Sequence, residues 1–259
     1  MYKHCYNGLV FFSNRNKICK KNIVLFFYGL GLTSNDFRNI LIANQTKKQI
    51  IIPELPGHNG IKFKEYKDNI LEFTKKIYLF IKKKQIDNIL YFSNSIGGII
   101  PILLHKRFLK NQIKIKNFIN YEGNLTEFDT KTSTLKTSKY TLKQFKSKFS
   151  NLLMLCQNSN KIEIKLWGES IKKTCFKAFY YLSKDAVRYS KRTELLNFYR
   201  IFFKKKVYLF GGLNKQEIPV YFYGSSRLKI NGYGHFLFFE NIFVFNKIFN
   251  TLVIKKNGR

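Results

Sequence analysis

The chain has 259 residues, and its 47 Lys and Arg against 15 Asp and Glu give a formal net charge of +32 at pH 7. Its 45% hydrophobic content excludes an intrinsically disordered protein. The length suits one domain with an insertion.

The excess positive charge has two readings. Attraction to nucleic acid, an anionic membrane or an acidic protein is one of them. Compositional drift is the other, and we favour it because the lysines are spread along a chain that is also rich in Asn, Ile, Phe and Tyr. No zinc-finger spacing or other nucleic-acid motif accompanies the charge. We therefore expect no nucleic-acid partner and keep an acidic protein partner open.

Cysteine spacing and hydropathy bear on the compartment. The run Leu9 to Phe12 is too short for a signal peptide, and no segment approaches 18 consecutive apolar residues. We expect a cytoplasmic protein with no membrane span, no metal and no cofactor. The four cysteines lie far apart without C-x-x-C spacing, which favours a reducing compartment; they are Cys5, Cys19, Cys156 and Cys175.

Along the chain, strand-like runs alternate with helical patterns. The clearest helical patterns cover 65–84 and 96–109. This alternation predicts an α/β fold with a mostly parallel sheet flanked by helices, and ligands bind such sheets beyond the carboxyl ends of the strands. The expected strands are 8–13, 22–28, 49–53, 88–92 and 115–121.

A pentapeptide after the fourth of these strands carries the strongest functional signal. Ser93–Gly97 reads small-x-Ser-x-Gly and leads into an apolar, helix-like stretch. A serine nucleophile on a sharp strand-to-helix turn needs small residues two positions before and after it. This pattern makes Ser95 the candidate nucleophile. The alternatives are that Ser95 merely caps the helix, or that Ser93 is the reactive serine.

Three further segments complete a recognisable set. A buried strand runs into Tyr28-Gly29-Leu30-Gly31, and another leads into Pro53-Glu54-Leu55-Pro56-Gly57-His58. Near the C-terminus stands Gly232-Tyr233-Gly234-His235-Phe236. With the pentapeptide, these segments follow the chain order of the α/β-hydrolase superfamily, which the chain resembles over 8–123 and 205–254. In that family the first two segments usually read His-Gly-x-Gly and Asp-x-Pro-Gly-His-Gly.

The resemblance assigns roles to several residues. It implies His235 as the general base and the backbone N–H groups of Leu30 and Ile96 as the oxyanion hole. Tyr28, in place of the usual His, and Trp167 are candidate substrate-binding residues.

The acidic member of the site is the uncertain one. The family's usual Asp after the seventh strand is replaced here by Asn214. Some members carry the acid after the sixth strand, where this chain has Glu122. We therefore predict that Glu122 contacts an imidazole nitrogen of His235, with Glu217 and Asp129 as the alternatives.

The resemblance also divides the chain. It implies a hydrolase core formed by 1–123 and 201–259, with a helical cap at 124–200 inserted after the sixth strand. The aromatic residues of this segment either hold the cap together or line an acyl pocket.

Two classes of function follow. The first is a serine hydrolase that cleaves a carboxylic ester or thioester through an acyl-enzyme; the substrate is a small-molecule or carrier-protein-linked acyl ester. One specific candidate is a pimeloyl-carrier-protein methyl ester esterase of biotin synthesis, since a basic surface suits an acidic carrier protein. The second is a catalytically inactive hydrolase scaffold that acts as a binding protein.

Overall fold

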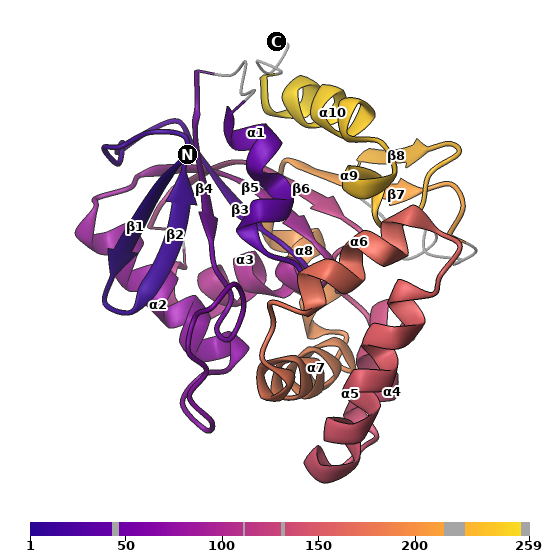
Figure 1. The fold of residues 1–259 in the computed structure, drawn as a ribbon. Coiled ribbons are helices and arrows are strands. Elements are labelled where there is room, and N and C mark those ends of the chain that lie inside the picture. Colours follow the sequence, from indigo (N-terminus) through magenta and orange to yellow (C-terminus); the bar gives the residue numbers. More distant parts are fainter. Residues whose placement is uncertain (43–46, 111, 131–132, 215–225, 255–259) are drawn as a thin grey trace.

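The computed structural model describes residues 1–42, 47–110, 112–130, 133–214 and 226–254. Within these ranges the chain folds around an eight-stranded sheet in the order β1-β2-β4-β3-β5-β6-β7-β8 (Figure 1). The two pairings that involve β2 are antiparallel, and all pairings from β4 to β8 are parallel. The expected mostly parallel sheet is confirmed.

The inner strands are the ones that hydrophobic runs predict. All five residues of β3 and of β4 are buried, as expected for strands covered on both faces. The strands are β1 Tyr2–Tyr6, β2 Leu9–Ser13, β3 Ile23–Phe27, β4 Gln49–Pro53, β5 Asn88–Asn94, β6 Lys114–Tyr121, β7 Lys206–Gly211 and β8 Ser226–Ile230.

The two edge strands were not expected from the sequence. β1 and β8 are largely exposed and polar, so they lack the hydrophobic signal of the inner strands. β1 joins β2 through Asn7 and Gly8, whose φ angles of 46° and 74° are those of a tight hairpin turn. The Asn-Gly pair is the signal that could have revealed this hairpin.

Helices fill the connections between the strands. Of the helical pattern expected at 65–84, the part Ile70–Lys83 forms one helix. The pattern at 96–109 becomes a short 3-10 turn, a helix and a wider turn. The helices are α1 Arg38–Ile42, α2 Ile70–Lys83, α3 Ile99–Leu103, α4 Ser133–Ser138, α5 Leu142–Gln157, α6 Ile162–Ile171, α7 Phe176–Ser190, α8 Glu194–Phe202, α9 Leu237–Glu240 and α10 Ile242–Ile254.

Aromatic side chains on β5 show which helices cover which face. Phe92 packs on Phe249 of α10, with ring centroids 5.2 Å apart. The preceding residue, Tyr91, packs on His105 and Phe203 instead. Because neighbouring residues of a strand point to opposite faces, α10 covers one face and the α3–α8 layer covers the other.

The segment between β6 and β7 is helical, as expected. It holds α4 to α8; α4 packs on α7, and α6 packs on both α5 and α9 (Figure 1). The same segment also reaches the helices on the α3 side of the sheet, because α8 contacts α3 and α7 contacts α2. The segment 124–200 therefore approaches the sheet in two places, one of them beside the C-terminal motif that holds His235.

Candidate active site

Ser95 lies at a strained turn between β5 and the helical segment that follows. Its φ angle is 53°, a left-handed conformation that non-glycine residues seldom adopt. Such strain persists only where the surrounding structure enforces it, and it is found at functional sites. The turn lifts the Ser95 side chain beyond the carboxyl end of β5, where a ligand of a parallel sheet binds.

The small residues beside Ser95 are needed for steric reasons. A Cβ at Gly97 would lie 2.4 Å from the carbonyl oxygen of Phe27, which no side chain can tolerate. Ser93 is fully buried, and its hydroxyl donates a 2.8 Å hydrogen bond to Asn120 Oδ1 on β6. Ser93 is therefore a packing residue of the sheet, whereas Ser95 is partly exposed.

The structure brings Glu122 and His235 together. Glu122 Oε2 lies 2.6 Å from His235 Nδ1, the contact predicted from the sequence. Glu122 follows the end of β6 with a φ of 44°, so its side chain also leaves the sheet from a strained position. Because Glu122 occupies Nδ1, Nε2 is the imidazole nitrogen left for another partner.

Two further donors hold the Glu122 carboxylate. Oε1 accepts hydrogen bonds from the backbone N–H of Gly211, at 2.6 Å, and from the side-chain amide of Asn214. Asn214 stands where the resemblance places an aspartate, and here it supports the acid on the neighbouring strand. Three donors of the described residues thus surround the carboxylate.

The structure describes one of the two alternative acids, Asp129. Asp129 Oδ2 accepts from the backbone N–H groups of Leu125 and Thr126, at 2.8 and 2.7 Å, and from the Thr126 hydroxyl. Burial raises the pKa of Asp129 to about 6, and the nearby charge of Glu122 adds to the effect. None of these hydrogen bonds of Asp129 involves His235. Glu217 lies outside the described residues.

The histidine of the Pro-Gly-His loop has a structural environment. His58 is fully buried, and burial lowers its pKa to about 4, so the ring is neutral near pH 7. Its Nδ1 lies 3.0 Å from the carbonyl oxygen of Pro56 and must carry the proton. Nε2 is then free to accept the backbone N–H of Gly31, at 3.2 Å.

The turn after β3 runs beside Ser95. A Cβ at Gly29 would lie 2.9 Å from Ser95 Cβ and 3.4 Å from Ser95 Oγ. The backbone N–H of the next residue, Leu30, therefore belongs to a segment that touches the candidate nucleophile.

Two side chains clamp the peptide that follows. His58 accepts the N–H of Gly31, and the Trp167 indole N–H donates to the carbonyl oxygen of Leu30 at 3.1 Å. A Cβ at Gly31, whose φ is 74°, would lie 2.7 Å from Ile171 and 3.0 Å from the Trp167 indole nitrogen. The clamp thus joins α6 and the Pro-Gly-His loop to the turn beside Ser95.

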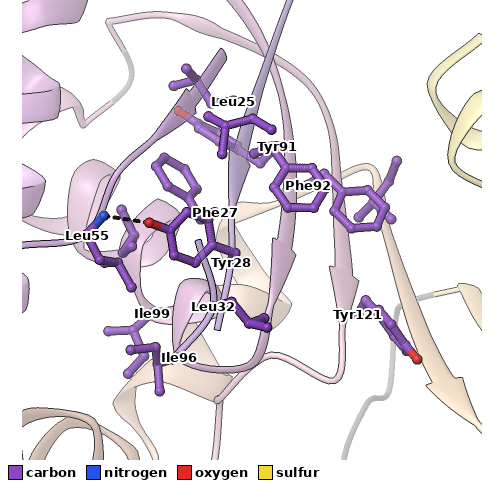
Figure 2. Packing of buried hydrophobic residues seen from close by; sticks show 14 of the residues in the cluster. Leu25, Phe27, Tyr28, Leu32, Leu55, Tyr91, Phe92, Ile96, Ile99 and Tyr121 are labelled. Carbon is purple, nitrogen blue, oxygen red and sulfur yellow. Dashed lines mark hydrogen bonds between the residues drawn. The ribbon is translucent and has the colours of Figure 1, made fainter. Parts of the chain in front are cut away.

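Tyr28 does not take the place that the sequence suggested for it. Its ring is buried, and its hydroxyl accepts the backbone N–H of Leu55 at 2.8 Å (Figure 2). The same hydroxyl donates to the buried carboxylate of Glu54. Burial, and next the Glu54 charge, raise the pKa of Tyr28 well above its usual value. Tyr28 is not among the residues that line the cavity beside Ser95, which corrects its assignment to substrate binding.

One cavity of about 290 Å³ collects the candidate residues. Ser95, Glu122 and His235 all line it, and so do Leu30 and Trp167. Ile96 is buried directly behind Ser95 and contributes no side chain to the lining.

Several lining residues were not anticipated from the sequence. Asn94 precedes the nucleophile position and Phe236 follows His235, so both stood inside motifs but received no role. Others come from the segment between β6 and β7 or from the turn after β3, where no local pattern announces them; they are Leu32, Ser133, Thr134 and Ile164.

Metal binding and membrane insertion have no support in the described part of the chain. It contains no group of three His, Cys, Asp or Glu side chains arranged to hold a metal ion. None of its helices combines the length and the apolar character needed to cross a bilayer.

The sequence and the structure were compared with those of known proteins. No family model matches the sequence, and no curated protein matches it either. Solved structures do match. A carboxylesterase of the thaumarchaeon Nitrososphaera gargenis superposes with a TM-score of 0.73 at 13% identity, covering 97% of this chain and 98% of the other.

Two further structures agree. The N-acyl homoserine lactonase AidH, complexed with N-butanoyl homoserine, gives a TM-score of 0.70 at 12% identity with both chains fully covered. MenH from S. aureus gives 0.66 at 16% identity, covering 92% of this chain and 96% of that one. At these identities the likeness concerns the fold. The chain has the fold of the α/β-hydrolase superfamily.

Proposed function

We propose that the protein is a serine hydrolase that cleaves a carboxylic ester or thioester through an acyl-enzyme. One observation carries the proposal: Ser95 sits at a strained strand-to-helix turn and shares a cavity with a histidine whose Nδ1 is held by a buried carboxylate. A nucleophile, a base and an orienting acid are the three parts that activate a serine hydroxyl.

In this mechanism, His235 Nε2 takes the proton of the Ser95 hydroxyl as the oxygen attacks the substrate carbonyl. The backbone N–H groups of Leu30 and Ile96 stabilise the resulting oxyanion. His235 then protonates the leaving group, and a water activated by the same nitrogen hydrolyses the acyl-enzyme. Glu122 keeps the proton on Nδ1 and stabilises the imidazolium that forms in each step.

The neighbours of known activity support this class. They include a carboxylesterase and a lactonase, and both names describe hydrolysis at an acyl carbon. We propose further that helices α4 to α7 act as a cap, since Ser133, Ile164 and Trp167 from this region line the cavity.

The experiment is activity profiling with p-nitrophenyl esters of graded acyl length, with the Ser95→Ala variant as the blank. Turnover that the blank lacks supports the proposal. A purified, folded protein that neither hydrolyses any ester nor reacts with a fluorophosphonate would favour an inactive scaffold that binds a partner. A pimeloyl-carrier-protein methyl ester belongs in the panel, because the basic surface could dock an acidic carrier protein.

The acid gives a sharp prediction. Glu122→Gln should lower kcat by about 10³- to 10⁴-fold. All three groups around the carboxylate donate hydrogen bonds, so the new amide NH2 must face one donor wherever it turns. If it faces His235, the ring is held with its proton on Nε2 and can no longer act as a base.

Asn214→Ala is the matched control, since it removes one donor to Oε1 and leaves the charge in place. Its kcat should fall by about ten- to a hundred-fold, the effect of one hydrogen bond to a charged group. Steady-state kinetics on one ester decide the question. Equal losses in the two variants would show that the charge of Glu122 is not what matters.

Trp167 gives a second prediction. Trp167→Phe keeps an aromatic ring against Phe236, 5.4 Å away between centroids, but removes the donor to the Leu30 carbonyl. We expect kcat to fall by about three- to ten-fold with little change in KM, because a loosened peptide weakens the oxyanion hole. A raised KM with unchanged kcat would instead mean that Trp167 acts only as a substrate contact.

A further inference from the structure

The cavity beside Ser95 differs in charge from the rest of the protein. The chain carries 47 Lys and Arg and a net charge of +32. Among the described residues that line the cavity there is no Lys or Arg, and there are two carboxylates, Glu122 and Asp129. A ligand that enters therefore leaves a cationic surface for an acidic interior, which disfavours a negatively charged group on the substrate.

The two carboxylates are not equivalent. Both oxygens of Glu122 are occupied by the three donors around it. In Asp129, by contrast, Oδ2 takes all the recorded hydrogen bonds, which come from Leu125 and Thr126. Within the described parts of the chain, no donor is recorded for Asp129 Oδ1. Asp129 thus lines the cavity with one of its two oxygens uncommitted.

A second acceptor in the lining is also unused. Asn94 is 1% exposed, and its Nδ2 donates to the carbonyl oxygen of Tyr121 at 3.2 Å. That acceptor fixes the orientation of the amide, because a reversed amide would place two oxygens together. Asn94 Oδ1 is then left buried, with no partner among the described residues. A buried acceptor without a donor is unfavourable, so a ligand that supplies one gains affinity.

The walls of the cavity suit a cation. Trp167 and Phe236 line it, and their ring faces attract positive charge. Burial raises the pKa of Asp129 to about 6. The carboxyl is therefore mostly ionised near pH 7, and a bound cation would lower this pKa and hold the group charged.

We infer that the cavity selects esters that carry a protonated amine in the acyl or the alcohol part, with the ammonium N–H donating to Asp129 Oδ1 in the cavity that Trp167 and Phe236 also line. The inference rests on the proposed hydrolase function and specifies its substrate class. It differs from the pimeloyl ester, whose acyl chain near the scissile bond is uncharged. Asp129 becomes a specificity residue and no longer a candidate for the catalytic acid.

Matched esters test the inference. In the alcohol series, 3-(dimethylamino)propyl butanoate is compared with its neutral isostere 4-methylpentyl butanoate and with anionic 3-carboxypropyl butanoate. In the acyl series, methyl 4-(dimethylamino)butanoate is compared with methyl 5-methylhexanoate and monomethyl glutarate. We expect kcat/KM for the cationic ester of at least one series to exceed that of its isostere by about ten-fold or more at about pH 7.5.

The variant Asp129→Asn keeps the shape of the side chain and removes its charge. It should bring the cationic-to-neutral ratio close to one, through a loss of kcat/KM on the cationic ester. Glu127→Gln is the matched control, because Glu127 is an exposed carboxylate two residues away and its loss changes the net charge equally. That variant should keep the wild-type ratio.

Inhibition of the wild-type protein tests the inference without relying on a variant that could fail to fold. If the cation lies in the alcohol part of the substrate, 3-(dimethylamino)propan-1-ol should inhibit the wild-type protein more strongly than 4-methylpentan-1-ol. If the cation lies in the acyl part, 4-(dimethylamino)butanoate should inhibit it more strongly than 5-methylhexanoate. Turnover with no preference for the cationic ester in either series would overturn this inference and leave the proposed function standing. A protein without turnover or labelling would overturn both. Loss of labelling in Asp129→Asn with its fold intact would overturn the specificity role of Asp129.

Discussion

Ser95→Ala is expected to abolish ester hydrolysis and covalent labelling by a fluorophosphonate while leaving the fold intact. Removal of a serine nucleophile lowers kcat by about 10⁶-fold in a hydrolase of this kind, which brings the rate near the background. Alanine also suits the site sterically, since only the hydroxyl is lost. Labelling followed by intact-mass spectrometry and a far-UV circular dichroism spectrum measure the two expectations.

Ser93→Ala provides the matched control. Both serines lie in the same pentapeptide, but the Ser93 hydroxyl is bonded to Asn120 and buried in the sheet. Its loss should lower stability by about 1 kcal/mol and leave labelling in place. Activity retained in Ser95→Ala, with activity lost in Ser93→Ala, would show that the wrong serine has been assigned.

His235→Gln is the second change with a large expected effect. The glutamine can still reach Glu122, but it cannot accept a proton from Ser95, so kcat should fall by several orders of magnitude, to about the level of Ser95→Ala. Because the members of such a triad act as a unit, the double variant should be no worse than either single variant. Initial rates of the three variants on one ester give this comparison directly.

His4→Gln is the control for the general effect of removing an imidazole. His4 lies on the edge strand β1, where its Nε2 is 3.2 Å from the carbonyl oxygen of Arg15, far from the cavity in the sheet order. Its loss should leave kcat unchanged. A His235→Gln variant with near-wild-type turnover would remove His235 from the mechanism and leave Ser95 to be activated by another group.

Inner and edge strands differ in how well the sequence predicts them. β3, β4 and β5 were predictable because each contains an apolar run, which a strand covered on both faces requires. The edge strands β1 and β8 were not, because one side of an edge strand faces water and tolerates Lys, Arg and Ser. For β1 the Asn7-Gly8 turn was a usable local signal.

The candidate site residues also differ in how well the sequence predicts their positions. Ser95, His235 and Glu122 could be expected to share one cavity because each follows a motif or a strand end, and parallel strands deliver such residues to one edge of the sheet. Tyr28 followed the same rule and was misassigned, since its side chain turns inward to the buried Glu54. A strand end locates a residue, but the direction of its side chain depends on partners elsewhere in the chain.

The sequence by itself determined the fold class, the nucleophile motif and the order of the candidate residues, because these depend on hydrophobic period and on local steric limits. Only the tertiary structure decided that Asn214 supports Glu122, that Trp167 and His58 hold the peptide after Leu30, and that Asp129 faces the cavity beside Ser95. Each of these contacts joins segments far apart in the chain, or sets a side chain's direction through packing. No local pattern encodes such contacts, since they arise when the sheet and the helices that follow β6 come together.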